Sequence, residues 1–143
     1  MFMGTYEHGL DAKGRVIIPA KLREELGESF VVTLGLDGCL FAYPQSEWEI
    51  FADKLKSLPG TKEGRKLQRA FLANAETCDM DKQGRVLIPA KLRDKAGLSK
   101  EVVFVGVLSK LEIWSKEKWA GIDDDVDDIE DLMENMAQYD LTL

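Results

Sequence analysis

Two arginines, Arg15 and Arg85, each lie four residues after an aspartate, and this is the pattern in the chain best suited to binding chemistry. The planar guanidinium fork of arginine can donate to two acceptors on a guanine edge or clamp a phosphate. An aspartate at this spacing, Asp11 or Asp81, can hold the arginine in one rotamer, so that less entropy is lost on binding. A glycine before each arginine lets the backbone turn sharply and approach a ligand closely. Both motifs are therefore candidates for contact with nucleic acid.

Further basic side chains surround the two motifs. Phosphate contacts from such residues position a protein on DNA without reading its sequence. The candidates are Lys13, Lys21 and Arg23 around the first motif and Lys82, Lys91 and Arg93 around the second. The alternative interpretation is that each Asp–Arg pair is only a structural salt bridge at the start of a strand, and composition alone favours this alternative.

The two motifs belong to one internal repeat. Residues 11–23 recur as residues 81–93, with 10 of the 13 positions identical at an offset of 70. The similarity continues downstream with one inserted residue. The chain is therefore predicted to be a tandem duplication, with one unit over residues 1–73 and a second over residues 74–143.

The local patterns predict a β-β-α-β-β order in each unit. Short β-branched or apolar runs indicate strands, and a proline followed by a helix-forming run and a glycine indicates a short helix. Ser46 and Glu49 form a capping-box pattern that predicts the start of a longer helix. The expected strands cover residues 6–10, 16–18, 30–36, 39–43, 76–80, 86–88, 101–107 and 110–114, and the expected helices cover residues 20–26, 46–57, 61–74 and 90–96.

The size of each unit predicts how the two units combine. A β-β-α-β-β unit of about 45 residues rarely buries enough apolar surface to fold alone. We therefore expect the two units to intertwine around one shared core with pseudo-twofold symmetry, which would place both Asp-x-x-x-Arg loops on one face. Trp48 and Trp119, which occupy equivalent positions near helix starts, are then expected to be packing residues.

The negative charge of the chain is concentrated at its end. The formal net charge is −7, yet residues 120–143 contain nine acids and no lysine or arginine, which leaves 19 bases against 17 acids in residues 1–119. Net charge therefore does not exclude a basic binding face. Helical spacing of apolar residues in the tail predicts an amphipathic helix, docked on the basic segment 54–69 of its own or a neighbouring chain. These residues are Ile122, Val126, Ile129, Met133 and Met136.

Several other classes of protein are disfavoured by the sequence. No apolar run has the length of a membrane span, and the first residues show no secretory signal pattern. Cys39 and Cys78 lie far apart without a partner pattern, which is typical of buried thiols in a reducing compartment. His8 is the only histidine, and there is no metal-ligand spacing, glycine-rich phosphate loop or nucleophile–base pair. We expect a cytoplasmic protein that is not an enzyme and uses no metal or cofactor.

The doubled motif Gly-Arg-Val-[Ile/Leu]-Ile-Pro-Ala-Lys-Leu-Arg, with an aspartate ahead of each copy, closely resembles the MraZ family of bacterial transcriptional regulators. The resemblance covers residues 1 to about 120. It implies an α+β, β-rich fold in which two SpoVT/AbrB-type repeats form a double-split β-barrel with flanking helices. It also implies a nucleoid-associated, ring-like homo-oligomer that binds direct repeats in double-stranded DNA upstream of the division and cell-wall gene cluster. Arg15 and Arg85 would then contact DNA, with Asp11 and Asp81 in the same motifs.

A function from another class stays open beside this one. Small AbrB-type domains also serve as assembly or interaction modules, including antitoxin-like ones, without specific DNA readout. Fusion of two copies and the absence of a disordered tail that could wrap a toxin argue against that function. The loop interiors also differ, with Ala12-Lys13 in the first and Lys82-Gln83 in the second. This difference favours a directional DNA repeat over a palindrome as the target of one protomer.

Overall fold

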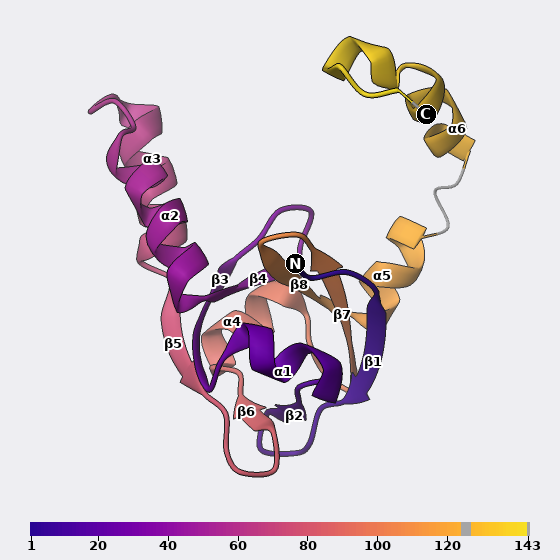
Figure 1. Ribbon diagram of the computed structural model, residues 1–143. Coiled ribbons are helices and arrows are strands. Elements are labelled where there is room, and N and C mark those ends of the chain that lie inside the picture. Colours follow the sequence, from indigo (N-terminus) through magenta and orange to yellow (C-terminus); the bar gives the residue numbers. More distant parts are fainter. Residues whose placement is uncertain (124–126, 143) are drawn as a thin grey trace.

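The computed structural model describes residues 1–123 and 127–142, and it shows the β-β-α-β-β order in both halves of the chain (Figure 1). The first half contains β1 (Thr5–Gly9), β2 (Arg15–Ile17), α1 (Ala20–Leu26), β3 (Ser29–Leu34), β4 (Leu40–Pro44), α2 (Gln45–Lys56) and α3 (Lys62–Leu72). The second half contains β5 (Glu76–Asp79), β6 (Arg85–Leu87), α4 (Ala90–Ala96), β7 (Glu101–Val107), β8 (Lys110–Ser115), α5 (Lys116–Asp123), α6 (Asp127–Glu134) and the 3-10 helix η1 (Met136–Tyr139).

The strands of the two halves interleave. Six of them form one antiparallel sheet in the order β1-β7-β8-β4-β3-β5, and β2 pairs with β6 in a separate two-stranded ribbon. Exchanging every strand for its counterpart in the other half reverses the six-strand order and leaves it otherwise unchanged. The predicted intertwining and pseudo-twofold arrangement are therefore present in the strand pairing.

The β-rich antiparallel sheet is present as expected, but it is open and does not close into a barrel. Its edge strands β1 and β5 do not pair with each other in the described part of the chain, and the β2–β6 ribbon is attached by one isolated bridge, Leu10 to Val16. The reason lies in the sequence, because β2 and β6 have only three residues each. One residue separates each strand from a proline, Pro19 or Pro89, and proline has no N–H with which to extend the hydrogen-bond ladder of the strand.

One core is shared by both halves. Its buried side chains include Phe30 and Leu40 from the first half and Phe104 and Ile113 from the second. A smaller cluster contains the buried Trp114, and Trp48 and Trp119 pack against it, as predicted. The ring centroids of Trp48 and Tyr43 lie 5.8 Å apart, those of Trp48 and Phe51 5.9 Å apart, and those of Trp119 and Trp114 5.8 Å apart.

The helix starts follow the prolines more closely than the capping pattern. The α1 and α4 helices begin directly after Pro19 and Pro89, as predicted. The α2 helix also begins directly after a proline, Pro44, and no side chain caps it, so the prediction of a capping box at Ser46 and Glu49 was wrong. Because β4 runs into the helix through Pro44, Ser46 already lies inside the first turn and is not at its cap.

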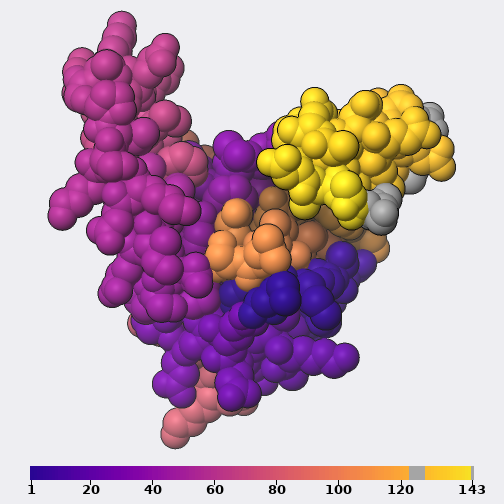
Figure 2. Space-filling view, turned by 45° about the horizontal axis from the view of Figure 1, so that its top comes forward, coloured from indigo at the N-terminus to yellow at the C-terminus, as the bar shows by residue number. Residues whose placement is uncertain are grey.

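Two helical projections extend from the end of the molecule opposite the β2–β6 ribbon (Figure 1). One consists of α2 and α3, and the other contains α5 and α6; Figure 2 shows the α2–α3 projection (magenta) apart from the C-terminal segment (yellow). Docking of the C-terminal helix on the basic segment 54–69 of the same chain was predicted, and the structure contradicts it. Leu132 and Met133 on α6 are 55% and 48% exposed, and η1 follows α6 almost directly in the chain. Val126 lies outside the described residues, and docking on a neighbouring chain stays a prediction.

Candidate nucleic-acid interface

Two equivalent loops lead into the ribbon strands. The first loop covers residues 11–15 and the second loop covers residues 81–85. In the first loop the Asp11 N–H donates to the Arg15 carbonyl oxygen at 2.8 Å, and the Gly14 N–H donates to the Asp11 carbonyl oxygen at 3.0 Å; the second loop repeats both bonds at the same distances. Gly14 and Gly84 have φ of 86° and 80°, a left-handed conformation that favours glycine.

Each aspartate organises its own loop. Oδ1 of Asp11 accepts from the backbone N–H groups of Lys13 and Arg15 at 2.9 Å, and Oδ2 accepts from Nε of Arg15 at 2.8 Å. These donors, the Arg15 backbone N–H first, lower the pKa of the Asp11 carboxyl below its ordinary value. The carboxylate is therefore ionised at neutral pH and holds the arginine in place.

The second loop has the same geometry. Oδ1 of Asp81 accepts from the N–H groups of Gln83 and Arg85 at 2.9 Å, and Oδ2 accepts from Nε of Arg85 at 2.8 Å. The Arg85 backbone N–H is again the largest cause of a lowered carboxyl pKa in Asp81. The Asp–Arg salt bridges of the alternative interpretation are thus present in both loops.

These salt bridges leave the binding end of each arginine free. The side chains of Arg15 and Arg85 use only Nε in hydrogen bonds to residues that the structure describes, and they are 32% and 35% exposed. The two terminal nitrogens of each guanidinium group are the pair that forms a fork. The aspartates thus orient both forks without occupying them.

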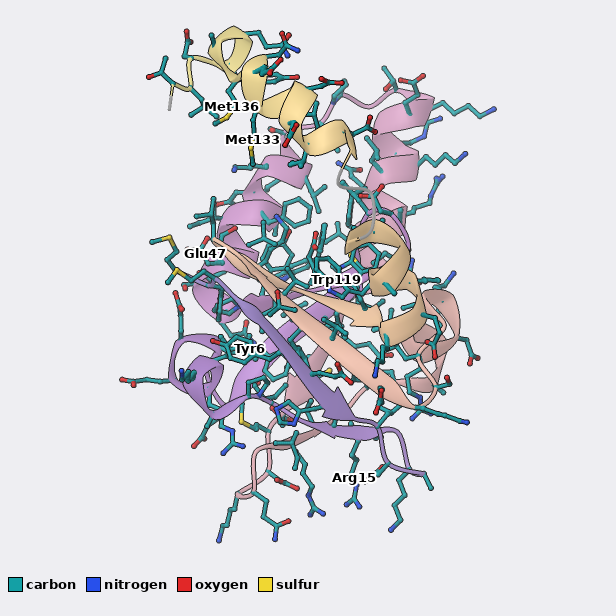
Figure 3. The ribbon with its side chains drawn as sticks, turned by 90° about the vertical axis from the view of Figure 1, so that its right-hand side faces the viewer. Tyr6, Arg15, Glu47, Trp119, Met133 and Met136 are labelled. Carbon is teal, nitrogen blue, oxygen red and sulfur yellow. The ribbon has the colours of Figure 1, made fainter. Side chains whose placement is uncertain are left out.

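The β2–β6 ribbon brings the two loops to one end of the molecule. Arg15 lies opposite Leu87 in the register, and Arg85 lies opposite Ile17. The chain is also joined crosswise, since the Ile18 N–H donates to the Gly84 carbonyl oxygen at 2.8 Å and the Ile88 N–H donates to the Gly14 carbonyl oxygen at 3.0 Å. Figure 3 shows Arg15 at the end opposite Met133 and Met136.

The other predicted binding residues divide into two groups. The side chains of Lys13, Lys21, Lys82 and Lys91 are exposed. Arg23 and Arg93 are half-buried and lie against the backbone, where Nε of Arg23 donates to the Ile18 carbonyl oxygen at 2.8 Å and Nη1 of Arg93 donates to the Lys13 carbonyl oxygen at 3.3 Å.

The contact of Arg23 and Arg93 with the loops was missed by the sequence reasoning. A Cβ added to Gly14 would coincide with the Arg93 guanidinium, and a Cβ added to Gly84 would collide with the Arg23 guanidinium. Both glycines are consequently buried although their loops lie at the surface. The glycine before each motif arginine was the available signal, because glycine often marks the close approach of another group.

Other reactive side chains lie apart from this face. Cys39 and Cys78 are buried and unpaired, and burial raises the pKa of each thiol to about 12. His8 is half-buried on β1. Within residues 1–123 and 127–142 no three histidine, cysteine or acidic side chains are grouped to hold a metal ion, and no helix is long and apolar enough to cross a membrane.

The fold and the site together define an intertwined tandem-repeat protein that presents two arginine-bearing loops on one face. The family model for the MraZ protein, whose description adds the words "antitoxin-like", matches the chain twice, at residues 1–70 and 71–139. The chain belongs to the MraZ family.

Curated relatives agree with this assignment along the whole chain. The chain is 57% identical over 142 residues to the transcriptional regulator MraZ of Lachnoclostridium phytofermentans, with 99% of both chains covered. It is 52% identical over 143 residues to the protein of the same name from Ligilactobacillus salivarius, covering 99% of this chain and 100% of the relative. The protein of that name from Thermoanaerobacter sp. is 61% identical over 120 residues, covering 83% and 84%.

Proposed function

We propose that this protein is a transcriptional regulator that binds double-stranded DNA sequence-specifically through the first and second loops. The observation that carries the proposal is the pair of oriented guanidinium forks, Arg15 and Arg85, whose terminal nitrogens form no hydrogen bond within residues 1–123 and 127–142. Arginine forks of this kind read the O6 and N7 acceptors of guanine in the major groove. The exposed lysines beside them would add phosphate contacts. No catalytic step is part of the proposal.

The proposed target is a set of direct repeats near the promoter of the division and cell-wall gene cluster. The name transcriptional regulator that the relatives carry supports a role in transcription, the unlike interiors of the loops support a directional repeat, and the choice of gene cluster follows the family resemblance alone. Lys13 in the first loop has Gln83 as its counterpart in the second, so one protomer presents a directional surface. Such a regulator would act in the cytoplasm, associated with the nucleoid.

The active form is proposed to be a ring-like homo-oligomer. Residues 1–119 carry only two more bases than acids, too little for tight binding by electrostatic attraction alone. Several protomers on adjacent DNA repeats multiply weak contacts through effective concentration. Exposed apolar side chains on both helical projections, such as Ile50 and Leu67 on one and Leu132 on the other, support self-association. Sedimentation that shows only monomers, together with tight DNA binding, would contradict the proposed oligomer.

An electrophoretic mobility assay on the DNA upstream of the protein's own gene tests the proposal. The wild-type protein is expected to shift this DNA and to leave a scrambled sequence of equal length unshifted at the same salt concentration. When the loop variants Arg15→Ala and Arg85→Ala are compared in the same assay, Lys66→Ala is the matched control. It also removes one exposed positive charge, but on α3, far from the loops. Equal binding of both DNAs, or of neither, would contradict the proposal.

A second candidate function is an antitoxin-like interaction module. The description of the family and the exposed apolar side chains of α6 favour it. It requires neither loop arginine, so a partner protein that binds the Arg15→Ala, Arg85→Ala double variant as well as wild type would support it. The mobility assay and this binding experiment together separate the two functions.

A further inference from the structure

We propose that Arg23 and Arg93 are positioning residues, each of which holds the DNA-binding loop of the opposite half of the chain. The two loops then form one cross-braced unit. The idea of a brace rests on the contacts of the free protein, and its effect on DNA binding rests on the function proposed above. It assigns these two arginines a role beyond phosphate contact.

The first half of the brace is the contact of Arg93 with the first loop. Arg93 lies on α4, 80 residues away from Lys13, whose carbonyl oxygen it binds through Nη1 at 3.3 Å. Its guanidinium fills the space in which a side chain at Gly14 would lie. The backbone just before Arg15 is thus covered by a residue of the other half.

The second half of the brace is the contact of Arg23 with the second loop. Nε of Arg23 donates to the Ile18 carbonyl oxygen at 2.8 Å, which fixes the guanidinium where a side chain at Gly84 would lie. The N–H of the same residue, Ile18, donates to the Gly84 carbonyl oxygen at 2.8 Å. Ile18 therefore connects Arg23 and the second loop through both of its backbone groups.

The two contacts explain why a glycine precedes each motif arginine. The positive φ at Gly14 and Gly84 costs little for glycine, and the missing side chain makes room for the opposite guanidinium. Each motif arginine is then held from two sides, by the aspartate of its own loop and by the covered glycine next to it. A loop fixed before binding loses less conformational entropy when it meets DNA.

Amide hydrogen exchange in the free protein tests the brace without DNA. Arg93→Ala is expected to speed exchange at Gly14 and Arg15 and to leave Gly84 and Arg85 unchanged. Arg23→Ala is expected to give the reverse pattern. The unaffected loop of each variant serves as the internal control for folding. Lys91→Ala, which removes an exposed charge from the same helix α4, should leave both loops unchanged.

The outcomes of the exchange experiment are distinguishable. Acceleration in the opposite loop supports the brace, whereas acceleration in neither loop, in both equally, or only in the loop of the same half overturns it. Should wild-type protein fail to bind any DNA specifically, the proposed function fails while these exchange rates still decide the brace.

A double-variant cycle on DNA affinity then separates positioning from direct phosphate contact. If Arg93 acts through the first loop, Arg93→Ala should lower the DNA affinity of the Arg15→Ala variant only a little. It should lower the affinity of the Arg85→Ala variant by as much as it lowers that of the wild type. Residues coupled in this way show a non-additivity of roughly 2- to 150-fold. If Arg93 contacts a phosphate directly, Arg93→Ala should lower the DNA affinity by the same factor in the Arg15→Ala and Arg85→Ala variants. That result would contradict the positioning role.

The conservative variant Arg93→Lys provides one more discrimination. Lysine keeps the charge and can replace arginine at a phosphate as a point charge, but it lacks the plane that covers Gly14. The brace predicts that Arg93→Lys accelerates exchange in the first loop nearly as much as Arg93→Ala does. Full restoration of slow exchange and of affinity by lysine would show that charge alone matters.

Discussion

Val16 lies directly opposite Val86 in the ribbon formed by β2 and β6, and both side chains are buried in the shared core. These two residues are equivalents in the internal repeat, 70 positions apart. When a residue pairs with its own equivalent, the pseudo-twofold axis passes between the two residues. Arg15 and Arg85 each immediately precede one member of this central pair, so the same axis relates the two arginines.

Replacement of Ile88 by valine tests whether this core is shared. Ile88 is fully buried, so Ile88→Val should lower the free energy of unfolding by about 0.5–1.5 kcal/mol. Urea denaturation should still show one transition, because both halves contribute to the same core. Ile17→Val on β2 is the control, since Ile17 is 41% exposed and should change stability far less. Two separate transitions would contradict a single core.

Loss of the motif arginines should abolish recognition and preserve the fold. If each makes a bidentate base contact, Arg15→Ala and Arg85→Ala should each weaken specific DNA binding by roughly 1–3 kcal/mol per contacted site. The melting temperature should hardly change, because the Asp–Arg pairs lie at the surface. Affinity and thermal unfolding are measured on the same preparations. If the variants unfold, or if they bind specific DNA as well as the wild type does, the Asp–Arg pairs are structural salt bridges and do not recognise DNA.

Lys21 and Lys91 should behave as phosphate contacts. Both are exposed on the short helices that follow the ribbon strands. Lys21→Ala and Lys91→Ala should weaken binding to specific and scrambled DNA alike. Each should reduce the slope of log affinity against log salt by about 0.9. A change confined to the specific sequence would instead indicate a base contact.

The hydrogen bonds that hold the two loops in place should depend on pH only under acidic conditions. The pKa of Asp11 is below its ordinary value of 3.8 in the folded protein. The stabilisation that its carboxylate provides is therefore complete above 3.8 and is lost as the pH falls through the lowered pKa. The chemical shift of the Arg15 Nε–H should stay constant from neutral pH down to about pH 3.8 and should change only at lower pH. In Asp11→Asn this transition should vanish from the first loop and persist at Arg85.

The two cysteines should be inert in the folded protein. Since burial raises the pKa of Cys39 and Cys78 to about 12, almost no thiolate is present at neutral pH. An aromatic disulfide reagent should release its chromophore slowly from native protein and rapidly from both thiols in urea. Rapid labelling of native protein would show that β5, which contains Cys78, or the turn before β4, which contains Cys39, opens readily.

The sequence predicted the local elements better than their long-range contacts. The bounds of α1 and α4 agree with expectation because a proline before and a glycine after each helix determine its ends locally. The intertwining also followed from the small size of each unit. The exposure of α6 and the identity of Arg93 as the group that covers Gly14 depend on segments far apart in the chain. The glycine before Arg15 signals that some group approaches closely, but no local pattern names its partner.

The crosswise strand pairing also governs how the chain can fold during its synthesis. Thr5 pairs with Val105 and Leu40 with Ile113, and β2 and β3 also pair with strands of the second half, so all four strands of the first half need partners that the ribosome makes later. At roughly 5–20 residues per second, the N-terminal strand waits several seconds for its neighbour. During this interval the nascent first half exposes strand edges and apolar surface that its own second half will cover. Equivalent segments of another nascent chain offer the same complement, so crowded translation of one message favours exchange of halves between chains.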